Sequence, residues 1–319
     1  MWQSTVRAGD GKLDNIQVLR AIAAIMVVFV HLDMVEATLG LVPFGYGGVD
    51  LFFEISGFIM VYTTMSRSVS PTKFLANRIT RIVPVYYLLT LVVFALAIAA
   101  PNLFRHTSAS LMDLVRSLLF VPFRKNGGPM QPTLFVGWTL NYEMLFYVLF
   151  AVGLMFKRYR DGLLFTGAVL VVLGALSIFA PFGNDLADFY TSPRMLEFGI
   201  GMAIALVHRQ IADILTRARI SDLVLKAVLA AAIAMLVLIP LTPNGTKLLA
   251  MALPMALPAT IALIAALVLQ DRGVRIAPRT TLVGDASYSL YLTHPFAVQA
   301  LQKFYVRLPP SPILALLFA

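Results

Sequence analysis

Residues 80–100 read TRIVPVYYLLTLVVFALAIAA, a stretch in which Arg81 is the only charged side chain. A helix needs about 20 apolar residues to cross the hydrocarbon of a bilayer, because each residue advances the helix by about 1.5 Å. This stretch is therefore predicted to be a membrane-spanning helix.

Similar apolar runs occur on both sides of it. They lie near residues 14–34, 47–66, 134–156, 162–180, 192–207, 223–241, 248–270 and 282–303. The chain ends in a shorter apolar run, 313–319, which we interpret as a tenth helix that is short or truncated at the C-terminus. The sequence thus predicts an all-α, polytopic membrane helix bundle of about nine to ten transmembrane helices, forming a single domain over residues 1–319.

The composition excludes other classes of protein. Of the 319 residues, 59% are hydrophobic and only 13% are charged, whereas about a quarter of the residues of a soluble domain are charged. The mean hydropathy of +0.84 also excludes a disordered chain. Cysteine is absent, and the four histidines show no metal-ligand spacing, so neither a thiolate nucleophile nor a metal site is expected.

The positive charges predict the orientation. If the N-terminus is cytoplasmic, sixteen of the 25 Lys and Arg residues fall in cytoplasmic segments and seven in outer segments. Cytoplasmic loops of membrane proteins collect Lys and Arg. The net charge of +9 is therefore read as topology rather than as nucleic-acid binding, and we expect a multi-pass protein of the inner, cytoplasmic membrane with its N-terminus inside.

Ionisable residues inside the first span are candidates for function. Arg20 and His31 are eleven positions apart, which is about 16 Å along a helix axis and nearly the same helix face. Such residues are costly in a membrane and usually face a cavity or a partner. A structural role is the alternative interpretation for each of them.

Arg78 and Arg81 form a second candidate group before the third span. At this spacing the two side chains are neighbours on a helix surface. We expect them on the inner side at the start of a helix, where backbone N–H groups also favour anions, so that the pair suits a phosphorylated ligand. The alternative is anchoring at the membrane surface or binding of anionic lipids.

Carboxylates and hydroxyls occur in other spans. Glu54 and Glu143 are expected at depths comparable with His31, where a carboxylate can orient an imidazole or share its proton. The ninth span begins with an unusually polar stretch, 284–295, which includes Ser287, Tyr288 and His294. Its hydroxyls are expected to line an inner cavity, with ordinary helix packing as the alternative for His294.

Five strings occur in a fixed order along the chain: Leu13-Asp14-x4-Leu19-Arg20 with His31; Gly47-Gly48-Val49-Asp50-Leu51-Phe52-Phe53-x-Ile55-Ser56-Gly57-Phe58; Arg78-x-x-Arg81-Ile82-x-Pro84; Trp138-Thr139-Leu140-x-x-Glu143-Met144-x-Phe146-Tyr147; and Ser287-Tyr288-Ser289-Leu290-Tyr291-Leu292-x-His294-Pro295. In this order they resemble the membrane-bound acyltransferase-3 family, over nearly the whole chain. Proteins of that family look like ten-helix enzymes that move an acyl group, usually acetyl from acetyl-CoA, onto a hydroxyl of a surface carbohydrate. The chain is most similar to the exopolysaccharide-production members.

The resemblance ties function to the Arg and His of the first span and to the Arg pair before the third, which are Arg20, His31, Arg78 and Arg81. The further roles follow when this resemblance is joined to the chemistry of the residues. His31 is expected to act as a general base or to form an acyl-imidazole, and Glu143 to orient it or balance its charge. The residues expected to bind the acyl-CoA donor are Arg20, Arg78, Arg81, Ser287 and Tyr288.

The expected partners follow from the same resemblance. They are acyl-CoA, a polysaccharide or lipid-linked glycan, and membrane lipids, with no permanently bound cofactor, no metal and no nucleic acid. Two alternatives remain at this point. One is a secondary transporter or flippase for glycans or lipids, and the other is a non-catalytic subunit of polysaccharide export.

Overall fold

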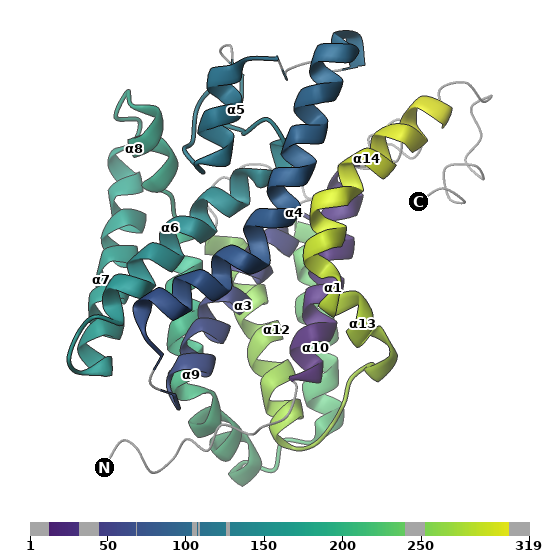
Figure 1. Ribbon diagram of the computed structural model, residues 1–319. Coiled ribbons are helices and arrows are strands. Elements are labelled where there is room, and N and C mark those ends of the chain that lie inside the picture. Colours follow the sequence, from purple (N-terminus) through teal and green to yellow (C-terminus); the bar gives the residue numbers. More distant parts are fainter. Residues whose placement is uncertain are drawn as a thin grey trace. The chain divides into compact units, whose positions relative to one another are not determined.

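The computed structural model describes residues 13–31, 45–67, 69–103, 107, 109–125, 128–239 and 253–305. In these ranges the chain is helical and forms no β-strand, apart from an isolated bridge between Arg124 and Met130 (Figure 1). The all-α prediction is confirmed. The α-helices are α1 (Asp14–Val30), α3 (Gly47–Thr64), α4 (Pro71–Ala99), α5 (Leu111–Leu118), α6 (Trp138–Gly153), α7 (Tyr159–Leu176), α8 (Asp185–Tyr190), α9 (Arg194–Arg217), α10 (Asp222–Leu238), α12 (Leu253–Asp271), α13 (Thr281–Asp285) and α14 (Ser287–Tyr305).

Within the described ranges, four helical segments are long and apolar enough to cross a membrane: Pro71–Ala99, Phe135–Gly153, Tyr159–Phe179 and Asp185–Arg217. The other predicted spans are also helical in the described ranges, but their helices do not meet the same criteria of length and apolar character. For example, α1 and α10 have 17 residues each, somewhat less than a full crossing needs. The count of nine to ten crossings and the cytoplasmic N-terminus remain predictions, and the predicted tenth run, 313–319, lies outside the described residues.

The chain divides into two compact units. Unit 1 combines the residues up to Ser66 with those from Ile200 onward, and unit 2 is the continuous segment Arg67–Gly199.

In unit 1, α1 packs against α3, α12, α13 and α14 (Figure 1). Two close approaches require glycine. A Cβ atom on Gly284 of α13 would overlap the backbone carbonyl of Gln17, and one on Gly201 of α9 would overlap the backbone carbonyl of Glu54. Backbones can approach this closely only where no side chain intervenes. Helix packing therefore accounts for both glycines.

A buried amide fixes the beginning of α1 within unit 1. The Asn15 side chain donates to the carbonyl oxygens of Ala266 and Val274 at 3.1 and 2.8 Å, and it accepts from the N–H of Ile276 at 2.9 Å. Its backbone N–H donates to Gln270 Oε1 at 2.9 Å. Since Asn15 is fully buried, these bonds satisfy polar groups that would otherwise be costly in the interior.

In unit 2, α4 packs against α6 through aromatic rings, and α6 packs against α7. The helix α4 begins at Pro71, because Pro71 occupies its first turn and Ser70 caps it by accepting from the N–H of Lys73 at 3.3 Å. The prediction that Arg78 and Arg81 open a helix is therefore wrong. Both lie two or more turns inside α4, where the backbone N–H groups are already bonded within the helix.

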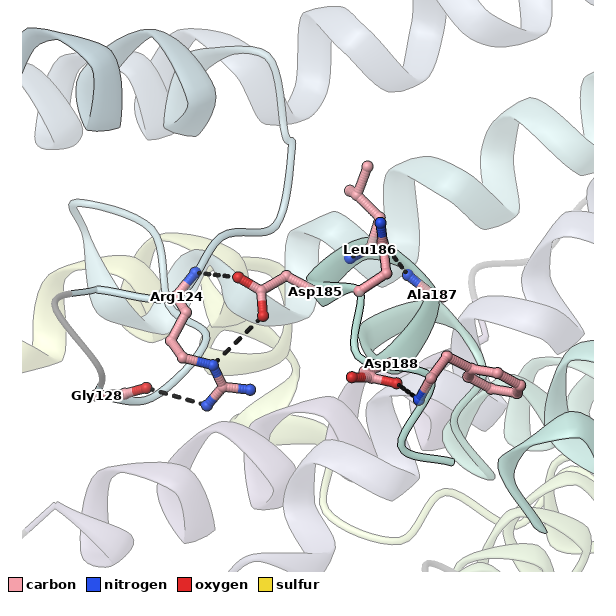
Figure 2. Close-up of polar contacts among 8 residues, drawn as sticks. Arg124, Gly128, Asp185, Leu186, Ala187 and Asp188 are labelled. Carbon is pink, nitrogen blue, oxygen red and sulfur yellow. Dashed lines mark hydrogen bonds and ion pairs between the residues drawn. The ribbon is translucent and has the colours of Figure 1, made fainter. Parts of the chain in front are cut away.

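A small polar cluster joins the segment after α5 to the start of α8 within unit 2. Figure 2 shows Arg124 between Asp185 and the carbonyl oxygen of Gly128. The backbone N–H and Nε of Arg124 donate to the two carboxylate oxygens of Asp185 at 3.2 and 3.3 Å. Asn184 caps α8 by accepting from the N–H groups of Leu186 and Ala187. This cluster fixes the conformation of the segment that carries Lys125.

Lys125 gives a pH-dependent expectation. It is buried, its Nζ donates to Thr107 Oγ1 at 3.2 Å, and burial lowers the pKa of its ammonium group from about 10.5 to about 8, with Asp113 acting in the opposite sense. Between these pH values the folded protein releases a proton that the unfolded chain retains. Stability is therefore expected to rise with pH over this window, by about 3 kcal/mol at most.

The measurement is the unfolding midpoint of the detergent-solubilised protein from pH 7 to 10.5. Lys125→Met should be more stable than the unaltered protein at pH 7 and should lose this part of the rise. Lys73→Met, at an exposed lysine of the same unit, is the matched control. Identical pH curves for Lys125→Met and the unaltered protein would contradict the prediction.

Candidate active site

Both candidate residues of the first span belong to unit 1, where Arg20 lies on α1 and His31 directly follows its last residue. The helix ends at Val30, and the backbone N–H of His31 caps it by donating to the carbonyl oxygen of Val28 at 3.1 Å. Since α1 is continuous, Arg20 and His31 lie about 16 Å apart along its axis. Arg20 is half-buried, and its Nη1 donates to Gln17 Oε1 at 3.0 Å. The two side chains therefore occupy different levels along the axis of α1.

His31 contacts a second imidazole. Nε2 of His294, on α14, lies 3.2 Å from Nδ1 of His31, and the ring centroids are 4.9 Å apart. His294 is almost completely buried, whereas His31 is half-buried. The sequence gives no signal for this pairing, because the two residues are 263 positions apart.

A backbone carbonyl defines the tautomer of His31. Nδ1 of His31 lies 2.9 Å from the carbonyl oxygen of Val27. A carbonyl oxygen can only accept a hydrogen bond, so Nδ1 must carry the proton. In the neutral ring the lone pair is then on Nε2. Nε2 is therefore the atom of His31 that can take a proton or attack a carbonyl carbon.

The polar stretch of the ninth predicted span begins α14. Ser287 is fully buried, and its Oγ makes no hydrogen bond within the described part of the chain. Tyr288 is half-buried. A buried hydroxyl without a partner is unusual and is suited to receive a ligand.

The two arginines of unit 2, Arg78 and Arg81, have different surroundings. Arg78 is half-buried, with its guanidinium 5.6 Å from the ring centre of Phe74 and 6.0 Å from that of Tyr147. Its Nε is buried and has no hydrogen-bond partner among the residues that the structure describes. Arg81 is exposed. Arg78 therefore combines a positive charge held by two aromatic rings with an unsatisfied donor.

Glu143 joins the same cluster. The hydroxyl of Tyr147 donates to Glu143 Oε1, one turn earlier on α6. Tyr147 thus touches both Glu143 and Arg78, and unit 2 brings these two predicted residues around one ring. Neither the sequence spacing nor the motif of α6 had indicated that Tyr147 would have this linking position.

Glu54 has a different environment in unit 1. It is fully buried on α3, and its Oε1 accepts from the Thr260 hydroxyl of α12 at 2.9 Å. Its Oε2 has no hydrogen-bond partner in the described ranges. The described ranges contain no group of three or more His, Cys, Asp or Glu residues that could hold a metal ion.

The comparison with known proteins identifies the family. The family model described as an acyltransferase domain, acyltransferase-3, matches residues 13–319. The exopolysaccharide production protein ExoZ of Rhizobium meliloti strain 1021 is 38% identical over 267 residues, which cover 81% of this chain and 78% of that protein. No solved structure matches the chain.

Two more distant relatives carry names of candidate acetyltransferases. A candidate O-acetyltransferase of Staphylococcus aureus strain COL is 25% identical over 210 residues, which are 59% of this chain and 33% of that protein. A candidate acetyltransferase of Acidianus two-tailed virus is 26% identical over 197 residues, which are 60% of this chain and 57% of that protein.

The chain belongs to the acyltransferase-3 family. It is a multi-pass membrane O-acyltransferase. Of the three classes of protein that the sequence left open, the family therefore favours the enzyme over the transporter and the non-catalytic subunit.

Proposed function

We propose that this enzyme transfers an acyl group, with acetyl as the expected one, from acyl-CoA to a hydroxyl of a cell-surface or exported polysaccharide. It would do so in the cytoplasmic membrane, with its N-terminus in the cytoplasm. The name of the Rhizobium relative supports a polysaccharide acceptor. The observation that carries the proposal is the contact of His31 Nδ1 with the Val27 carbonyl oxygen, which leaves the lone pair on Nε2.

The chemistry of transfer needs such a nitrogen. Nε2 of His31 takes the proton of the acceptor hydroxyl as its oxygen attacks the thioester carbonyl carbon. The tetrahedral intermediate then collapses, the C–S bond breaks, and the imidazolium returns its proton to the CoA sulfur. In the second route, Nε2 attacks the thioester first, the C–S bond breaks, and CoA leaves as a thiolate that takes a proton from solvent. The acceptor hydroxyl then attacks the acyl-imidazole, the acyl–Nε2 bond breaks, and the hydroxyl proton passes to Nε2 and on to solvent. Release of one equivalent of CoA without acceptor would distinguish the second route from the first.

In this proposal the donor is held by its phosphates. Acyl-CoA is a large anion, and guanidinium groups bind phosphate through paired, charge-assisted hydrogen bonds. Arg78 supports this role through its unsatisfied Nε and its ring contacts. The further donor-binding residues are Arg20, Arg81, Ser287 and Tyr288. Because Arg78 and Arg81 lie inside α4, the side chains alone must supply the binding energy, without a helix N-terminus.

Glu143 completes the proposed catalytic group. Its proposed role is to balance the charge of the imidazolium that forms when His31 accepts a proton. Tyr147 keeps the Glu143 carboxylate in one orientation by donating to Oε1. The transfer would then join a donor site on the cytoplasmic side with acid–base groups nearer the outer side.

Sealed vesicles of known orientation test this proposal. Acetyl-CoA is supplied only at the face that carries the N-terminus, and a membrane-impermeant glycan only at the opposite face. Acetylation of the glycan, with release of CoA on the first face, is expected. Acetylation only when both substrates share one face would overturn transfer across the membrane. Repeated turnover of acetyl-CoA, beyond one equivalent of CoA per enzyme, that is independent of any glycan would overturn the polysaccharide acceptor.

A further inference from the structure

From the contact between the two imidazoles we infer that His294 is a positioning residue for acyl transfer, whose Nε2 accepts a hydrogen bond from Nδ1–H of His31. The inference rests on the proposed role of His31. It concerns a residue of α14 that touches His31 at 3.2 Å and lies in the same unit.

The hydrogen bond has a definite direction because both rings are tied to the backbone. His294 Nδ1 lies 2.7 Å from the carbonyl oxygen of Tyr291, so this nitrogen carries a proton. In the neutral ring, His294 Nε2 then holds the lone pair. His31 Nδ1 also carries a proton, because it faces the Val27 carbonyl oxygen. The contact is therefore donation from His31 to His294, shared with Val27.

A proline beside His294 explains why the Tyr291 carbonyl is available. In an α-helix the N–H of residue 295 would donate to the carbonyl oxygen of residue 291. Residue 295 is a proline inside α14, and proline has no backbone N–H. The Tyr291 carbonyl oxygen can thus accept from the His294 ring instead. The local sequence Tyr291-x-x-His294-Pro295 therefore fixes the tautomer of His294.

The bond acts in each state of the reaction. Before the reaction, it holds the His31 ring with its lone pair on Nε2. When Nε2 takes the proton of the acceptor, His31 becomes an imidazolium, and its Nδ1–H bond to the neutral His294 becomes charge-assisted and stronger. A hydrogen bond that strengthens as charge develops lowers the free energy of the transition state more than that of the bound substrate complex, and it therefore lowers the barrier of the chemical step. His294 should consequently affect kcat more than it affects donor binding.

The experiment measures kcat and the half-saturating acyl-CoA concentration for three variants. His294→Leu removes the acceptor and is expected to lower kcat about 10- to 100-fold, which corresponds to one charge-assisted hydrogen bond, with little change in half-saturation. His294→Gln places an amide oxygen near the position of Nε2 and is expected to restore much of the rate. His208→Leu is the matched control, because His208 is also a buried imidazole of unit 1 but packs against Phe58, and its kcat should stay near normal.

Pro295→Ala keeps the His294 ring and therefore carries the test if His294→Leu fails to fold. It restores a backbone N–H that competes for the Tyr291 carbonyl oxygen, and it removes an unfavourable residue from a helix interior. We expect a several-fold lower kcat together with an equal or higher unfolding midpoint. If His294 had only a structural role, kcat and the unfolding midpoint of Pro295→Ala would change in the same direction.

The outcomes separate this inference from the proposed function. If His31→Ala is inactive while folded His294→Leu and Pro295→Ala turn over normally, the positioning role is overturned and the proposed function stands. Equal losses in His294→Leu and His208→Leu would also overturn it, since any buried imidazole would then matter alike. If His31→Ala itself stays active, the proposed role of His31 in catalysis fails, and the positioning role fails with it, whereas acyl transfer as the function stands.

Discussion

Replacing His31 with alanine is expected to lower the rate of acyl transfer by a factor of about 10² to 10⁴, the usual contribution of a general base. The substitution removes Nε2, the nitrogen whose lone pair follows from the Val27 contact. The protein should still fold, because His31 is only half-buried and caps α1 through its backbone N–H rather than its side chain. The readout is acceptor-dependent CoA release by the purified protein.

Two companion variants sharpen the result. His31→Gln preserves much of the side-chain volume but offers no basic nitrogen, and it should be as inactive as His31→Ala. His208→Ala removes another imidazole from the same unit and should leave the turnover near that of the unaltered protein. A folded His31→Ala protein with nearly normal turnover would rule out a catalytic role for this histidine.

The second large effect is expected at Arg78. Arg78→Gln should raise the acyl-CoA concentration for half-maximal rate about 10- to 100-fold, because a charge-assisted hydrogen bond contributes about 1.5 to 3 kcal/mol. Arg78→Lys keeps the charge but not the planar fork, and it should give an intermediate value. Arg81→Gln should change the same quantity in the same direction. Steady-state rates measured over a range of acyl-CoA concentrations at saturating acceptor provide the comparison.

The matched control for Arg78 is Arg116, whose guanidinium lies 5.8 Å from the ring centre of Phe123. Arg116→Gln removes the same kind of cation–π contact from the same unit and should leave the donor requirement unchanged. If Arg78→Gln instead weakened only the acceptor requirement, the guanidinium would belong to the glycan site and the donor assignment would be inverted.

Hydropathy predicted where the helices lie but not where they begin. The run 80–100 is the apolar part of α4, which starts at Pro71 because of a Ser-Pro cap that was present in the sequence. The run 282–303 is interrupted at Ala286, where α13 ends and α14 begins. Hydropathy reports how much of a helix can enter lipid, whereas capping and backbone bonding decide its ends.

The chemical groups of the site could be predicted more readily than their neighbours. An Arg and a His within one apolar run could be recognised from spacing and hydropathy, as could the neighbouring positions of Arg78 and Arg81. The partners of these groups, His294 and Tyr147, are supplied by packing. A contact between α1 and α14 depends on how helices from opposite ends of the chain associate, and no local pattern encodes that.

Because unit 1 consists of two segments separated in the sequence by unit 2, its two parts are synthesised at different times. A ribosome completes the contiguous unit 2 before it has made Ala266, Val274 and Ile276, which hold the Asn15 amide. During that interval the first helix lacks the residues that bind the Asn15 amide in the folded protein. It also lacks His294, which is made later still. A nascent chain is therefore without the partner of His31 until α14 has been made, and in the proposed function the capacity for acyl transfer would arise only after that point.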